Sequence, residues 1–197
     1  MKKKFNRVYQ FKITLKGIKP PIWRRIQIPE TYTFWALHVA IQDAMGWGDY
    51  HLHEFEAVDP STGLKVNIGI PDEEFGREIL PGWKQKITDY FSMENQSANY
   101  VYDFGDNWEH KIQLEKILPR DENIQYPVCT AGKRACPPED CGGVRGYEEF
   151  LEAIRDPQHE QHEEMLEWIG GKFDSEHFDP EEVIFEDPDE RLKLTFE

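Results

Sequence analysis

The stretch Tyr100–Lys116, YVYDFGDNWEHKIQLEK, has a clear structural pattern within this 197-residue chain. Two runs of alternating residues flank a short segment of Asp, Gly and Asn, which is the pattern of a β-hairpin. We therefore predict strands over residues 98–104 and 108–117, with Gly105 at the turn. Side chains two apart on a strand share a face. The imidazole of His110 is thus expected on the apolar side, with the following side chains: Trp108, Ile112 and Leu114.

Two aspartates, Asp103 and Asp106, bracket the predicted turn, and two interpretations of them remain open. Aspartate side chains accept hydrogen bonds from nearby backbone N–H groups in tight turns, so both can be turn residues. With His110 they can also form part of a site. The tripeptide DFG is found in protein kinases, but this chain lacks their glycine-rich phosphate loop and HRD-type catalytic loop, which excludes that class.

The first half of the chain predicts a sheet and one helix. Alternation predicts strands over residues 8–15 and 22–28, the second at a sheet edge because prolines flank it. Helical spacing predicts a helix from Phe34 to Met45, with Thr33 as its N-cap and Gly46 as its C-terminal stop. Further strands are expected over residues 53–58 and 64–68, joined by a DPSTG turn, and a helical turn over 86–91.

The second half of the chain predicts a loop and then helices. Residues 118–145 are rich in Pro, Gly, Cys and charge, which indicates a structured loop. Helical spacing predicts a helix from Tyr147 to Ile154, another from Asp156-Pro157 to Gly170, and a short one opened by Asp179. The fold class is thus α+β: one domain with a mainly antiparallel sheet, one helix packed on it and a helical C-terminal region. Its parts are 1–117 (sheet), 118–146 (loop) and 147–197 (helical, acidic).

The charge is strongly negative and unevenly distributed, with a formal net charge of -15. Residues 1–48 hold nine Lys/Arg and two Asp/Glu, whereas residues 148–197 hold four and eighteen. An acidic chain repels phosphate backbones unless it has a local basic face, so nucleic-acid binding is not favoured. The basic residues of the N-terminal strands alternate with apolar ones, as on a solvated strand face. No long apolar run or signal peptide is evident, and we expect a cytoplasmic protein without a membrane contact.

Histidines predict one candidate site. His51 and His53 are two residues apart and share a strand face, from which imidazoles can bind a metal ion. If their strand lies beside the 108–117 strand, Asp106 and His110 can complete the shell. Glu139 or Asp140 can then act as a general base, which gives a metal-dependent hydrolase. The candidate residues are His51, His53, Asp103, Asp106, Trp108, His110, Glu139 and Asp140.

Three cysteines, Cys129, Cys136 and Cys141, predict a second candidate site. Their odd number and the missing secretion signal argue against a disulfide framework. Their spacing differs from the paired C-x2-C of zinc ribbons, so two interpretations remain: small buried thiols, or zinc ligands completed by His110 or Asp140. Zinc would order a loop that is otherwise too polar to fold by packing alone.

Four motifs carry a resemblance to a known family. They are IKPPIWRRIQIP (18–29), LHVAIQDAMGWGDYHLHEF (37–55), YVYDFGDNWEHKIQLEK (100–116) and CPPEDCGGVRGYEEFL (136–151). In this order they resemble the plasmid pRiA4b ORF-3-like family. The resemblance implies a single α+β domain found on plasmids and near mobile elements, and it implies no established activity, cofactor or partner.

Three functions follow as hypotheses. The first is a binding module in which the PPEDCGG loop packs on the YDFGDNW hairpin and holds a structural metal ion or a partner. The second is the metal-dependent hydrolase, and the third is a nucleic-acid accessory protein of a mobile element acting through the basic residues of 1–25. The sequence does not decide whether the chain is an enzyme, and zinc is the cofactor that it suggests.

Overall fold

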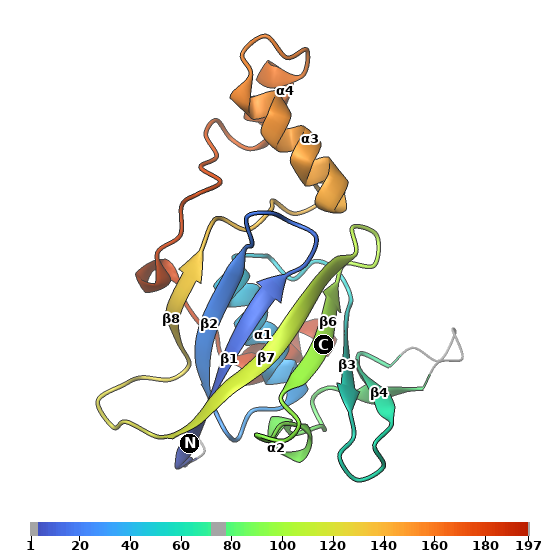
Figure 1. Cartoon of the computed structure of the whole chain (residues 1–197), viewed down its shortest axis with the longest axis vertical. Coiled ribbons are helices and arrows are strands. Elements are labelled where there is room, and N and C mark those ends of the chain that lie inside the picture. Colours follow the sequence, from blue (N-terminus) through green and yellow to red (C-terminus); the bar gives the residue numbers. More distant parts are fainter. Residues whose placement is uncertain (1–3, 72–77, 197) are drawn as a thin grey trace.

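A computed structural model of the chain describes residues 4–71 and 78–196. It holds an eight-stranded sheet in the order β5-β4-β3-β6-β7-β1-β2-β8 (Figure 1). The strands are β1 (Arg7–Leu15), β2 (Trp23–Pro29), β3 (His53–Val58), β4 (Lys65–Gly69), β5 (Ile79–Pro81), β6 (Ser97–Tyr102), β7 (Trp108–Pro119) and β8 (Val128–Lys133). The helices are α1 (Phe34–Met45), α2 (Ile87–Tyr90), α3 (Gly143–Arg155), α4 (His162–Trp168) and α5 (Pro188–Phe196), with a 3-10 turn at Pro180–Glu182.

The predicted hairpin is the β6–β7 pair at the middle of the sheet. Tyr100 lies opposite His110 in this antiparallel ladder. All neighbouring strands run antiparallel except β4 and β5, which are parallel. The predicted α+β class, with a mainly antiparallel sheet and C-terminal helices, is confirmed.

Helix α1 forms the second layer and closes the core. It packs behind the sheet in the view of Figure 1. Thr33 begins the helix by accepting a hydrogen bond from the Ala36 N–H, and Gly46 ends it at φ 89°, where glycine carries no steric cost. The sheet meets α1 with the alternate side chains that the sequence predicted, among them Tyr9, Phe11, Ile13 and Leu15, which are all buried.

The remaining helices leave one sheet face uncovered. Helix α5 lies against α1, whereas α3 and α4 project beyond one end of the sheet (Figure 1). Polar side chains of this face, Gln10, Arg25, Gln113 and Glu115, line a shallow pocket. Among the helices of the described residues, none combines the length and apolarity that a bilayer crossing requires.

Three local predictions were wrong. Strand β2 is internal because β8 pairs with its outer side, and the prolines that suggested an edge stand before the strand or at its end, where they remove no central ladder bond. The predicted loop over 118–145 contains the end of β7 and all of β8. The helix expected at Asp156 begins at His162, because the Asp156 carboxylate accepts from the Gln158 N–H in a local turn.

Candidate functional site

Three segments meet at one end of the β6–β7 hairpin: residues 46–53, the 102–108 turn and the 136–143 loop. The indole of Trp47 donates to the Pro137 carbonyl at 2.9 Å. The Gly142 N–H donates to the Asp106 carboxylate at 3.0 Å. The 136–143 loop, which contains two of the cysteines, therefore folds over the aromatic hairpin.

The two aspartates differ in what they hold. Asp103 stabilises its own turn, because its Oδ1 accepts from the Gly105 N–H at 2.9 Å. Asp106 binds the loop instead. Asp103 has φ 55°, in the left-handed region that side chains disfavour, and so do Asp49, Asn107 and Asp140. Backbone strain of this kind costs about 1–3 kcal/mol per residue and gathers at functional sites.

The rim cluster consists of His51, Asp103 and Asp140, one residue from each of the three segments. His51 Nε2 lies 2.9 Å from Asp140 Oδ1 and 3.6 Å from Asp103 Oδ2. This nitrogen is shielded from solvent, yet it makes no well-directed hydrogen bond. The ligand atoms of the three residues all lie within 4.8 Å of one another, the spacing of a site that could hold a metal ion. The Asp140 side chain is 67% exposed, so the cluster opens to solvent on one side.

Glu139 lies beside the rim cluster and has hydrogen-bond partners of its own. Its carboxylate accepts from the Gly48 N–H at 2.8 Å and from the Tyr102 hydroxyl at 3.1 Å. Burial raises the pKa of Glu139, although both hydrogen bonds act to lower it. A half-buried carboxyl with a raised pKa is suited to proton transfer.

The inner cluster consists of His38, Asp49 and His53 and lies in the core. His38 Nε2 is 2.8 Å from Asp49 Oδ1, and His38 Nδ1 is 2.8 Å from the Tyr100 hydroxyl. Since the carboxylate can only accept, Nε2 carries the proton and Nδ1 accepts from Tyr100. His53 stacks on His38, and its Nδ1 has no hydrogen-bond partner. Burial lowers the pKa of both imidazoles, so both are neutral at neutral pH.

His110 lies apart from both clusters. It is fully buried between Trp47 and Tyr100, with ring centroids at 5.4 and 5.2 Å, and neither of its ring nitrogens makes a hydrogen bond. Burial lowers its pKa to about 3. The predicted set of His51, His53, Asp106 and His110 is therefore not brought together: His51 joins the rim cluster and His53 the inner cluster. Trp108 is fully buried and packs near Trp47.

The three cysteines are free thiols, and Cys129 is buried. Burial raises the pKa of Cys136 and raises that of Cys141 to about 12, so both remain protonated. In the part of the chain that the structure describes, the rim and inner clusters are the groups with metal-ligand spacing, and neither contains a cysteine. The geometry therefore favours imidazole and carboxylate ligands over the alternative in which the three thiols bind zinc.

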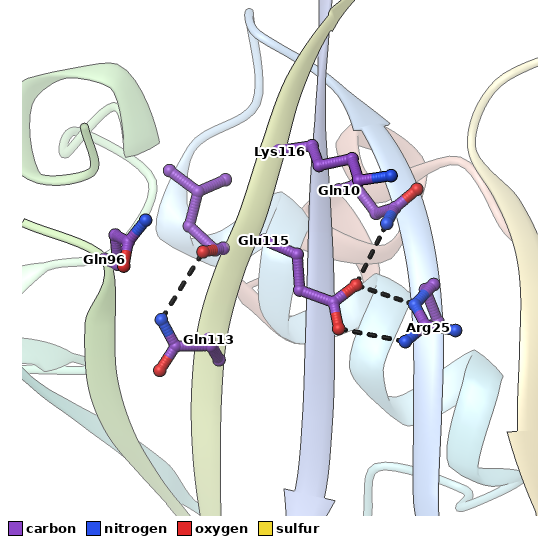
Figure 2. A pocket seen from close by; sticks show the side chains of 7 residues that line it. Gln10, Arg25, Gln96, Gln113, Glu115 and Lys116 are labelled. Carbon is purple, nitrogen blue, oxygen red and sulfur yellow. Dashed lines mark hydrogen bonds and ion pairs between the residues drawn. The ribbon is translucent and has the colours of Figure 1, made fainter. Parts of the chain in front are cut away.

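Two cations of the uncovered sheet face, Arg25 and Lys16, pair with carboxylates of β7. Arg25 and Glu115 form two hydrogen bonds of 2.6 and 2.9 Å, and Gln10 donates to the same carboxylate (Figure 2). Lys16 lies 3.3 Å from Glu109. These basic side chains are thus neutralised across the strands, which agrees with a solvated face rather than a phosphate-binding one.

Comparisons with known proteins place the chain among proteins of unknown function. A family model described as "Plasmid pRiA4b ORF-3-like protein" matches residues 7–182. The uncharacterized protein y4hQ of Sinorhizobium fredii is 40% identical over 164 residues, which are 83% of this chain and 81% of that one. The crystal structure of MM3350, a protein of unknown function from Methanosarcina mazei Go1, is 55% identical and has a TM-score of 0.87, covering 92% of this chain and 100% of that one.

Proposed function

This chain belongs to the plasmid pRiA4b ORF-3-like family, and on that premise we propose that it is a binding module whose rim cluster holds a divalent metal ion. The ligands are His51, Asp103 and Asp140. One observation carries the proposal: ligand atoms from three distant segments lie together, and the His51 nitrogen among them is shielded from solvent and makes no well-directed hydrogen bond. The proposal places the protein in the cytoplasm, where its three free thiols would stay reduced.

The donor set indicates the type of ion. One imidazole and two carboxylates suit zinc, with ligand distances of about 2.0–2.2 Å. Two ligands of a tetrahedral ion at such distances lie about 3.4 Å apart, and the separations of His51 Nε2 from the two carboxylates, 2.9 and 3.6 Å, bracket this value. Three protein ligands leave a fourth position toward solvent, where a partner's carboxylate or imidazole can bind.

The ion would also serve the architecture. It would join the 136–143 loop to the hairpin and to the segment before β3, and those parts otherwise meet through hydrogen bonds such as Gly142 to Asp106. An ion that binds only the folded chain raises its stability in proportion to the logarithm of the free ion concentration.

The test is calorimetric titration of Zn²⁺ into chelator-treated full-length protein. We expect one ion per chain, and at least about tenfold weaker binding in His51→Ala and in Asp140→Asn. His177→Ala is the matched control, because His177 also lies beside a carboxylate, 2.7 Å from Glu182, but on an exposed surface. Unchanged zinc binding in His51→Ala would overturn the proposal. Binding lost in Cys129→Ser but kept in His51→Ala would assign the ion to the thiols.

A metal-dependent hydrolase is the second candidate, and the position of Glu139 favours it. Glu139 is next to a proposed ligand, and its raised pKa suits a general base for a metal-bound water. Glu139→Gln separates the two functions: a hydrolase would lose turnover of activated ester substrates while it keeps zinc, whereas a binding module has no such turnover in either protein.

A further inference from the structure

Helix α5 is attached to the molecule by specific contacts rather than by burial. It begins at Pro188, after the residues 7–182 that the family model matches. None of its residues is buried, and Leu194 is 81% exposed. A helix with so little buried area gains little from the hydrophobic effect. Its position against α1 must therefore come from a few polar and aromatic contacts.

The first contact is made by the Arg191 guanidinium, which pairs with Glu186 of its own segment at 2.7 Å and reaches two carboxylates outside that segment. Arg191 Nη1 lies 3.2 Å from Asp49 Oδ2, and its Nη2 lies 3.4 Å from Asp43 Oδ1. The side chains of Asp43 and Asp49 are 5% and 10% exposed, and that of Arg191 is 14% exposed. Ion pairs shielded from solvent to this degree are screened far less than surface pairs.

The second contact is aromatic. The Phe196 ring lies 4.9 Å from the Trp83 ring and 6.2 Å from the Trp35 ring. The Trp35 indole also donates to the Pro188 carbonyl at 2.9 Å, which fixes the start of the helix. The surface that contacts α5 thus has a charged end, formed by Asp43 and Asp49, and an aromatic end, formed by Trp35 and Trp83. All four residues lie in the part of the chain that the family model matches.

The Asp43 carboxylate takes a cation and a backbone donor from the C-terminal segment. Burial raises the pKa of Asp43 to about 6, even with Arg191 in contact. Of the hydrogen bonds to the Asp43 side chain, the one from the Glu186 N–H comes from the same C-terminal segment. Removal of that segment would take away the backbone donor and the cation of Asp43 and would open its carboxylate to another positively charged group.

We infer that the surface formed by Trp35, Asp43, Asp49 and Trp83, here called the α5-binding surface, is a peptide-recognition site for a partner protein. The partner presents an arginine and, five positions later, an aromatic residue. Helix α5 occupies this surface within the same chain and shows which side chains fit. Charge complementarity selects the arginine, and the two indoles select the aromatic residue. The bound partner replaces α5, so the C-terminal segment acts as a competitor.

The test uses the full-length chain with its own α5 weakened by the double substitution Arg191→Ala and Phe196→Ala. A fluorescent peptide with the sequence of residues 186–196 is titrated with this variant and with the unmodified chain, and anisotropy is measured. We expect saturable binding to the variant, at least about tenfold tighter than to the unmodified chain, whose surface is occupied. Circular dichroism confirms that the variant is folded.

Matched controls assign the contacts. A peptide carrying Lys193→Ala should bind as the parent does, because Lys193 is exposed. A peptide carrying Arg191→Ala, and a receptor that also carries Asp43→Asn, should each bind at least about tenfold more weakly. Absence of binding to the folded variant, or binding indifferent to Asp43→Asn, would overturn the inference. If the unmodified chain is a dimer and Arg191→Ala makes it a monomer, the surface binds α5 of a second copy. This result would overturn the inference that a different protein binds there.

Discussion

The imidazole rings of His38 and His53 stack with their centroids 3.4 Å apart and their planes 8° from parallel. One ring comes from α1 and the other from β3, so the pair joins the helix to the sheet. His38 is held by Asp49 and Tyr100, whereas His53 Nδ1 has no hydrogen-bond partner. Two rings this close inside the core cannot both carry a charge, and burial lowers the pKa of each, which favours the neutral forms.

Stability should therefore fall in mild acid. Burial lowers the pKa of His38, His53 and His110 below the ordinary 6.5, to about 3 for His110. Below pH 6.5 these histidines bind protons in the unfolded chain but stay neutral in the folded chain. The free energy of unfolding therefore decreases as pH falls toward each folded pKa. Each histidine contributes a slope of about 1.4 kcal/mol per pH unit. Urea unfolding at pH 7, 6, 5 and 4 measures it.

Asp43 acts in the opposite direction. Its pKa is raised from 3.8 to about 6, so its contribution to stability is lost as pH rises through 6 and offsets one histidine between about pH 4 and 6.

His110→Phe fills the aromatic space without a titrating group and should lose less stability between pH 7 and 4. An identical slope in this variant would contradict the assignment.

Tyr100→Phe should destabilise the protein by about 1–3 kcal/mol, because it leaves buried polar groups without a partner. The Tyr100 hydroxyl donates to His38 Nδ1 and accepts from the Gln42 amide at 2.9 Å. Tyr50→Phe is the control, since Tyr50 is 77% exposed and should change little. Equal midpoints of thermal unfolding in the two variants would show that the hydroxyl does not support the cluster.

Neighbouring arginines on β2 should respond very differently to truncation. Arg24 is 1% exposed and donates to the carbonyls of Ala44 at 2.7 Å and Lys133 at 3.2 Å. Arg24→Ala leaves these carbonyls unpaired beside a cavity and should cost about 3 kcal/mol or more. Arg25→Ala removes a partly exposed pair with Glu115 and should cost about 0.2–1 kcal/mol. Chemical denaturation of both variants checks the difference, and equal losses would refute it.

Gly143→Ala tests the contact between the loop and the hairpin. A Cβ at Gly143 would lie 2.5 Å from the Asp106 carbonyl oxygen, and the residue has φ +70°. Gly170 has φ +81° but nothing within 4 Å of its Cβ position, so Gly170→Ala carries only the backbone cost. We expect Gly143→Ala to be less stable than Gly170→Ala by about 1–3 kcal/mol. Faster amide exchange around Gly142 should accompany the loss.

The sequence correctly predicted the elements that show a regular pattern of apolar residues along consecutive positions. Helix α1 has the predicted bounds, and β3 and the β6–β7 turn follow from alternation and turn chemistry. Strand β8 was missed because its six residues hold a glycine and lie in a region of loop composition. Helix α5 was missed because its side chains are mostly exposed, so its sequence carries a weak apolar pattern.

The site was predicted only in part, because ligand sets depend on contacts between distant segments. His51, Asp103 and Asp140 were all candidates, but the prediction that His51 and His53 share a strand face was wrong. Strand β3 begins at His53, and His51 lies in the bend before it, so the two enter different clusters. His38 and Asp49 were missed. A signal existed for His38, because apolar residues surround it in the predicted helix from Phe34 to Met45, and a polar residue buried there needs a partner.

The order of the strands has a consequence for newly synthesised chains. Strand β1 pairs with β7, so Ile13 meets Ile112, and β2 pairs with β8. At about 5–20 residues per second, the ribosome needs roughly 5–20 s to deliver the hundred residues that separate these partners. During this interval the nascent β1–β2 hairpin has two unpaired strand edges and an exposed apolar face. Such edges can pair with those of chains on neighbouring ribosomes. Slower elongation lengthens that exposure, so we expect it to lower the yield of folded protein.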